Sequence, residues 1–206
     1  MGLFDRFRKP KKEITGSLDI FEKFLERFEP SENLVKPTIE MLDWYRDKLP
    51  EDLLYFWTQY GFGNYGNGLI KVVEPSDYMD SFYLWLGKED FSKLPILVTA
   101  FGDIFYYRKL AVENEDVSLL DIHYRQINVC DYSLSGFFED YIVDEGIIEE
   151  VLRKSLFEES VEKSGPLKSE EIFYFEPALI AGGAEELKYI GRGTGSVHQE
   201  LLFQMG

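Results

Sequence analysis

The spacing of hydrophobic residues changes along the chain, and each spacing predicts a different kind of element. In the first quarter, apolar residues recur every three or four positions, which places them on one face of a helix. Helices are therefore predicted over residues 18–28, 39–45 and 53–60. The third is the most apolar, and Gly61 is a residue suited to end it.

The middle of the chain is rich in β-branched and aromatic residues, which is typical of strands. A helix over 76–86, opened by Pro75, interrupts this pattern. The Gly102-Asp103 pair separates two apolar runs and predicts a hairpin. The predicted strands are 68–73, 95–101, 104–110, 117–123 and 126–129.

The last third mixes both patterns. Ser133 is a suitable N-cap for a helix that contains Phe137 and Phe138. The further predicted segments are a helical stretch at 145–156, a polar run at 158–168, a strand at 171–175 and a closing helix at 197–203.

This order of elements predicts an α+β fold, or mixed α/β, made of two abutting α+β halves. Each half is expected to hold a short antiparallel sheet flanked by helices. The composition shifts near residues 131–135, so we place the boundary between the halves there.

Two glycine clusters resemble ligand-binding motifs at first sight. Gly61 to Gly66 spells G-x-G-x-x-G, but a dinucleotide site needs this pattern after a strand and before a helix. Here it follows a predicted helix and precedes a strand, so we predict a helix end and a turn. The cluster at 191–196 lacks the lysine of a phosphate-binding loop and is predicted to be a flexible connection; anion binding by Arg192 is the less favoured alternative.

Candidate ligands and nucleophiles are few. The chain has two histidines, His123 and His198, and a single cysteine, Cys130, so no metal site or other cofactor is predicted. His123 and Cys130 fall in predicted strands, and we interpret them as a structural histidine and a buried thiol. One cysteine excludes an internal disulfide and fits a reducing compartment. An acid–base pair of carboxylates assembled by the fold stays open as an alternative.

The charge distribution favours a protein partner. The chain carries −16, and residues 1–12 carry +4, so the remainder carries −20. A body of this sign repels nucleic acid and anionic lipid and attracts basic proteins. The simpler alternative is that the acidity only keeps the protein soluble.

The start of the chain is expected to be a mobile basic arm, residues 1–16. It lacks the long apolar stretch of a secretory signal, and nowhere does the sequence hold the roughly 20 apolar residues of a membrane span. We therefore predict a cytoplasmic protein without stable membrane association. Weak membrane contact through Leu3, Phe4 and Phe7 is the alternative for the arm.

Two segments resemble known families. Residues 45–63, from Tyr-Arg-Asp-Lys-Leu-Pro through Phe-Trp-Thr-Gln-Tyr-Gly-Phe-Gly, with Gly-Leu-Ile at 68–70 and Pro-Ser-Asp-Tyr at 75–78, resemble the GAD-like domain. Residues 165–183, with Glu-Pro-Ala-Leu and a closing Gly-Gly, resemble the C-terminal domain of type VI secretion immunity proteins. Glu176 departs from that second pattern, which has an apolar residue there.

After the basic arm at 1–16, the resemblance implies a GAD-like domain at 17–131 and an immunity-type domain at 132–206. It implies a cytoplasmic, non-enzymatic immunity protein that binds a cognate toxin, in one branch of the family a nuclease, and it supplies no catalytic residues. A protein-interaction module of the SMI1/KNR4-like kind is the alternative. The predicted partner-binding residues are acids expected to be exposed: Asp77, Asp80, Glu89, Asp90, Glu113, Glu115 and Asp116.

Overall fold

The computed structural model describes residues 13–111 and 114–205. Within these ranges the helices are α1 (Glu22–Arg27), α2 (Ile39–Tyr45), α3 (Glu51–Gln59), α4 (Met79–Leu86), α5 (Leu134–Gly136), α6 (Glu145–Glu150), α7 (Lys154–Ser164) and α8 (Gly195–Gln204). The strands are β1 (Gly63–Tyr65), β2 (Ile70–Val72), β3 (Lys93–Thr99), β4 (Ile104–Lys109), β5 (Glu115–Asp121), β6 (Gln126–Asp131), β7 (Glu171–Phe175) and β8 (Ile190–Thr194). Most of the arm predicted at 1–16 lies outside the described residues.

The strands form two antiparallel sheets. In the described residues, β1 to β6 make a six-stranded sheet whose spatial order follows the sequence, and β7 pairs with β8. The hairpin predicted at Gly102-Asp103 joins β3 to β4. The α+β class predicted from the sequence is therefore confirmed.

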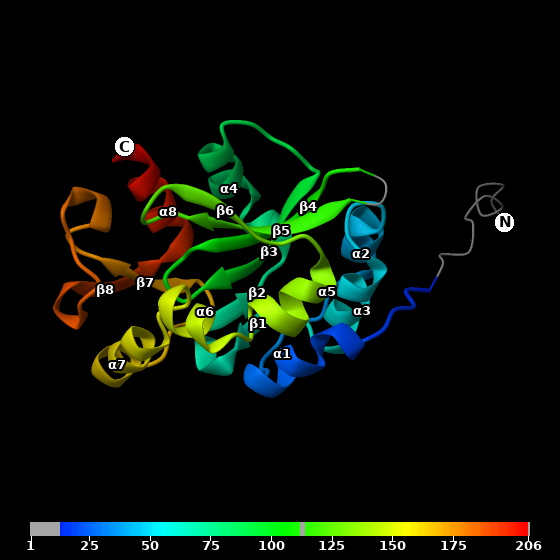
Figure 1. The fold of residues 1–206 in the computed structure, drawn as a ribbon, viewed down its shortest axis with the longest axis horizontal. Helices are drawn as coiled ribbons and strands as arrows, with labels where there is room; N and C mark the ends of the chain where they lie inside the picture. The colour runs from blue at the N-terminus through cyan, green and yellow to red at the C-terminus, as the bar shows by residue number, and fades with distance from the viewer. Residues whose placement is uncertain (1–12, 112–113, 206) are drawn as a thin grey trace, which may run out of the picture.

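Helices cover both faces of the larger sheet (Figure 1), with α1 and α5 on one side and α4 on the other. The first four residues of β4, Ile104 to Tyr107, are all buried, although successive side chains point to opposite faces of the sheet. Phe105 and Tyr107 enter one core cluster, and Ile104 and Tyr106 enter the other. Since both faces are buried, the polar alternation of a half-exposed strand is missing.

Aromatic packing crosses the boundary that we predicted near residue 131. A π-helical segment, Phe137–Tyr141, follows α5 and packs against the first half. The Phe138 ring lies 4.7 Å from that of Phe21, and the Phe137 ring lies 5.3 Å from that of Phe105. The two halves therefore share one core, and the domain limits drawn from the sequence stay a prediction.

The first glycine cluster ends a helix, as predicted. Helix α3 begins after Pro50, and its first-turn acids, Glu51 and Asp52, suit the positive end of the helix dipole. Gly61 then adopts a φ of +103°, which favours glycine. Its carbonyl accepts a hydrogen bond from the Tyr65 hydroxyl at 2.9 Å. The segment turns the chain from α3 into β1.

In the C-terminal part, the polar run at 158–168, for which no element was predicted, is mostly helix α7. This helix exposes its charges and buries Phe157 and Ser160. One prediction in this part is wrong. The cluster at 191–196 contains strand β8 instead of a flexible connection. A Cβ on Gly191 would meet the Tyr174 ring at 2.5 Å, so the glycines make room for aromatic side chains.

Candidate partner-binding surfaces

Three of the predicted contact residues are exposed acids. Asp77, Asp80 and Glu89 are exposed, and no hydrogen bond or ion pair from the described residues reaches their side chains. Asp80 and Glu89 line one surface hollow of about 500 Å³ together with Phe203 of α8. Asp77 lines a separate hollow of about 270 Å³ beside Glu170. The fold thus brings two of the acids together, and their role in binding stays a prediction.

Two further predicted acids hold the local structure. Asp90 accepts a hydrogen bond from the Ser92 hydroxyl at 2.6 Å and pairs with Lys93 at 3.1 Å. The Ser92 bond and the Lys93 charge outweigh partial burial, so the pKa of Asp90 is lowered. Glu115 accepts hydrogen bonds from the Tyr107 hydroxyl at 2.6 Å and from the backbone N–H of Leu134 at 3.0 Å. Glu115 therefore ties the sheet to the start of α5.

Asp116 is buried, so the expectation that it is an exposed acid is wrong. The Arg108 Nε–H lies 3.0 Å from both carboxylate oxygens of Asp116, and the Ser118 hydroxyl donates to one of them at 3.0 Å. The alternation of β5 turns this side chain inward, and Arg108 neutralises it there. Glu113 lies outside the described residues.

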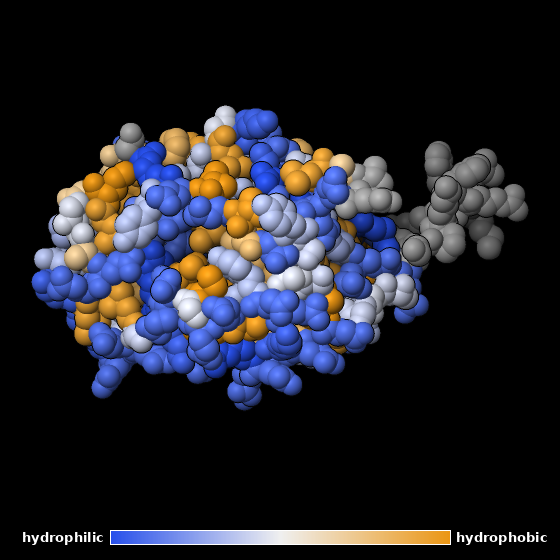
Figure 2. All heavy atoms as spheres, in the orientation of Figure 1, coloured by the Kyte–Doolittle hydropathy of each residue, from blue (hydrophilic) through white to orange (hydrophobic). Residues whose placement is uncertain are grey.

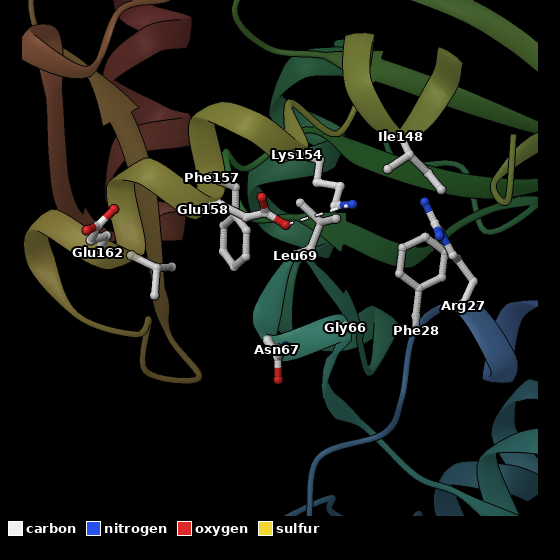
Figure 3. A pocket seen from close by; sticks show the side chains of 11 residues that line it. Arg27, Phe28, Gly66, Asn67, Leu69, Ile148, Lys154, Phe157, Glu158 and Glu162 are labelled. Atoms are coloured by element: carbon white, nitrogen blue, oxygen red, sulfur yellow. Dashed lines mark ion pairs between the residues drawn. The ribbon is translucent and has the colours of Figure 1, made fainter. Parts of the chain in front are cut away.

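A groove of about 420 Å³ runs between the two halves (Figure 3). Its lining combines apolar side chains with charged ones at the rim. Lys154 pairs with Glu158 across 3.8 Å, and Arg27 pairs with Glu145 at 2.6 Å. The apolar lining residues are Phe28, Leu69, Ile148, Phe157 and Val161. Such a surface offers hydrophobic contact to an incoming side chain.

A buried ion-pair network joins the two halves elsewhere. Arg153 donates from Nη1 to Asp103 at 2.8 Å and from Nε to Glu185 at 2.9 Å. Burial works against the charge of Arg153, but the two carboxylates outweigh it and raise the pKa of the guanidinium. The three residues are widely separated in sequence, and no spacing pattern signalled their contact.

Two buried polar side chains add to the junction. The Lys71 ammonium donates to the carbonyls of Lys168, Ser169 and Glu171, and burial lowers its pKa to about 8. Gln199 of α8 donates from Nε2 to the Gly102 carbonyl at 2.8 Å. Lys71 is satisfied by backbone carbonyls of the second half, and Gln199 also accepts from the Ser81 hydroxyl of the first half at 2.9 Å. Both side chains therefore connect the halves.

His123 and Cys130 occupy structural surroundings. His123 is buried, with Nε2 2.9 Å from the Phe101 carbonyl and its ring edge-on to Phe175. Cys130 is half-buried, and desolvation of its thiol raises the pKa to about 12. Within residues 13–111 and 114–205, no cluster of three or more His, Cys, Asp or Glu side chains is arranged to hold a metal ion. No helix of the same ranges is long and apolar enough to cross a membrane.

Comparison with known families matches most of the chain. Residues 19–119 match the family described as the GAD-like domain. Residues 131–206 match the family described as T6SS immunity protein Tdi1, C-terminal. The first part of the chain is thus similar to the GAD-like domain. Its C-terminal part is similar to the C-terminal domain of the type VI secretion immunity protein Tdi1, which supports an immunity role. The two matches confirm the resemblance seen in the sequence.

A solved structure shares the fold. The crystal structure of Atu4351 from Agrobacterium tumefaciens matches with a TM-score of 0.70 and 19% sequence identity, over 90% of this chain and 89% of that chain. At this identity the similarity shows a shared fold and nothing further. No curated protein sequence matches the chain.

Proposed function

We propose that this chain is an immunity protein that binds a cognate secreted toxin and neutralises it by covering its active or substrate-binding surface. The observation that carries the proposal is the pair of family matches, GAD-like followed by Tdi1 C-terminal, over residues 19–119 and 131–206. In this proposal the protein acts in the cytoplasm of the toxin-producing bacterium. It works by binding and not by catalysis.

The charge of the chain supports a basic toxin surface as the target. The protein carries −16. An enzyme that cuts nucleic acid needs a cationic surface to hold the phosphates, and an acidic protein is attracted to the same surface. We therefore propose a nuclease as the toxin, with Asp77, Asp80 and Glu89 among the groups that approach it. Attraction between opposite charges also speeds association.

The proposal is tested with the effector protein encoded beside the gene for this chain, in a catalytically inactive form. We expect a dissociation constant in the nanomolar range or below, about −12 kcal/mol or stronger. Co-expression of the chain with the active effector should restore growth. The absence of both binding and protection would contradict the proposal.

A charge-reversal variant tests the predicted acids. Changing Asp77, Asp80 and Glu89 together to lysine should slow association with the effector by about tenfold at low salt. The matched control changes Glu26, Glu150 and Glu159, three other exposed acids, to lysine and alters the net charge equally. If both triple variants associate equally slowly, the total charge of the chain controls association and the three predicted positions have no special role.

A further inference from the structure

The two edges of the six-stranded sheet differ in their protection. At the β1 edge, Pro30 bridges Tyr65 and Val35 bridges Phe62, with the Val35 N–H donating to the Phe62 carbonyl at 2.8 Å. Residues 30–35 therefore cover that edge. At the other edge, β6 pairs with β5 and with no other strand of the described residues.

Between Gln126 and Val129, strand β6 lacks the charges and prolines that commonly protect an open edge. Exposed edges are commonly blunted by charges or proline, because their free N–H and C=O groups can pair with another chain. Residues 126–130 contain neither. Instead, Ile127 is 50% exposed and Val129 is 42% exposed. Figure 2 shows hydrophobic atoms at the surface where Figure 1 draws β6.

The register of β6 places these two side chains on one face. Ile127 lies opposite Leu120 and Val129 lies opposite Ser118, so both lie on the sheet face that α4 and α8 cover elsewhere. A register shift at the start of β5 leaves Cys130 as an extra residue on β6. The regular, open part of the edge is therefore residues 126–129, long enough to pair with a short extended segment.

The charges around β6 indicate the chemistry of that segment. Asp121 and Asp131 lie at its two ends, and neither forms an ion pair with any described residue. Asp121 accepts the backbone N–H groups of His123 and Tyr124 at 2.9 Å, and Asp131 accepts from Ser133, so both are held in place. Arg125 is the cation near this edge, and its guanidinium lies 5.2 Å from the Trp85 ring.

The whole-chain charge points to the same chemistry. A second copy of a chain that carries −16 would be repelled. A cationic segment with apolar side chains would be attracted and would match Ile127 and Val129. Its main chain would satisfy the open backbone groups of β6, as in binding by strand addition.

We infer that residues 126–129 of β6 are a docking strand, to which an extended segment of the toxin with basic and apolar residues adds as a further strand. This inference rests on the proposed function and locates part of its contact surface. It concerns an edge of the sheet that none of the acids predicted from the sequence occupies.

The test is a double substitution, Ile127→Lys with Val129→Lys. The matched control is Val197→Lys with Ile180→Lys, which changes the same residue types at exposures of 52% and 43% and adds the same charge. Binding of the inactive effector is measured for both and for the unmodified chain, with circular dichroism to verify folding. We expect the β6 variant to bind at least about tenfold more weakly and the control to bind within about twofold of the unmodified chain.

Hydrogen exchange on the unmodified chain gives a second readout that needs no substitution. Adding the effector should slow exchange of the amides at 126–129. If the unmodified chain binds and the β6 amides keep their exchange rates, or the two double variants bind equally, the docking strand is wrong and the immunity function stands. If the unmodified chain neither binds nor protects, the proposed function itself fails. If the chain alone forms a dimer and the β6 substitutions dissociate it, this edge is an interface between two copies. That result would overturn the inference.

Discussion

Arg153 is the residue on which the buried charges between the halves converge. Its neighbours, Asp103 and Glu185, come from the β3–β4 turn and from the segment before β8. Arg153 has a φ of +55°, which separates α6 from α7 and aims the side chain at the sheet. A single helix over 145–156, as the sequence predicts, would carry the guanidinium elsewhere. The break is therefore part of how the network forms.

Removing this guanidinium should destabilise the folded protein. Arg153→Met leaves the buried Asp103 carboxylate without its cation, and we expect a loss of about 3–5 kcal/mol in the free energy of unfolding. Urea denaturation measures it. Adding Asp103→Asn removes the stranded charge and keeps an acceptor for the Ile122 N–H, which Asp103 now binds at 3.0 Å. The double variant should therefore be more stable than Arg153→Met; equal or lower stability would show that the charge is not the cause.

The single cysteine gives a second test at this scale. Because burial raises the pKa of Cys130 to about 12, the thiol stays protonated at pH 8, and the thiolate is the reactive form. A disulfide reagent such as DTNB should therefore react far more slowly with the folded protein than with the protein in urea. The rate in the folded state should rise as the pH is increased above 8. Equal rates in the two states would contradict the burial of this thiol.

Among the elements, β8 shows what a sequence pattern can and cannot reveal. Local spacing located most helices and strands, because their apolar residues report burial directly. Glycine-rich β8 gave no such signal, since Gly191 and Gly193 matter for the space they leave. Tyr174, which fills the space beside Gly191, comes from the neighbouring strand β7 and stacks on His198 with ring centroids 3.7 Å apart. Asp116 likewise depends on a side chain of the neighbouring strand, Arg108 of β4.

Adding side chains to β8 should destabilise the small sheet. Gly191→Ala places a methyl group against the Tyr174 ring, and we expect a loss of about 1–3 kcal/mol from the forced displacement. Thermal or urea denaturation measures it. In a background of Tyr174→Ala the same change should cost less, because the ring is gone. An equal cost in both backgrounds would place the strain elsewhere.

At the scale of the whole molecule, the two family matches meet in one core. The main hydrophobic cluster contains Phe105 of β4, Phe138 of the π-helical segment and Phe173 of β7. Phe101 of the hairpin also stacks on Phe175, with the rings 5.5 Å apart. Each half therefore buries aromatic side chains that the other half must cover.

Residues 132–206 should consequently not fold when expressed alone. Their circular dichroism should lack the helical signal of the full chain, since Phe137, Phe138 and Phe173 would face water. In the full chain, hydrogen exchange at β4 and at β7 should report the same opening free energy. A folded C-terminal fragment, or separate opening energies, would mean that the halves are independent units.

The unequal edges of the sheet also limit assembly. A strand that joins β6 finds a ladder to extend, whereas the opposite side, closed by residues 30–35, offers no site for a further addition. In the described residues, a strand added at β6 therefore has no open strand at the β1 edge to match it. Occupancy of β6 corresponds to one guest per molecule, a fixed ratio that a neutralising protein needs if each copy is to silence one target.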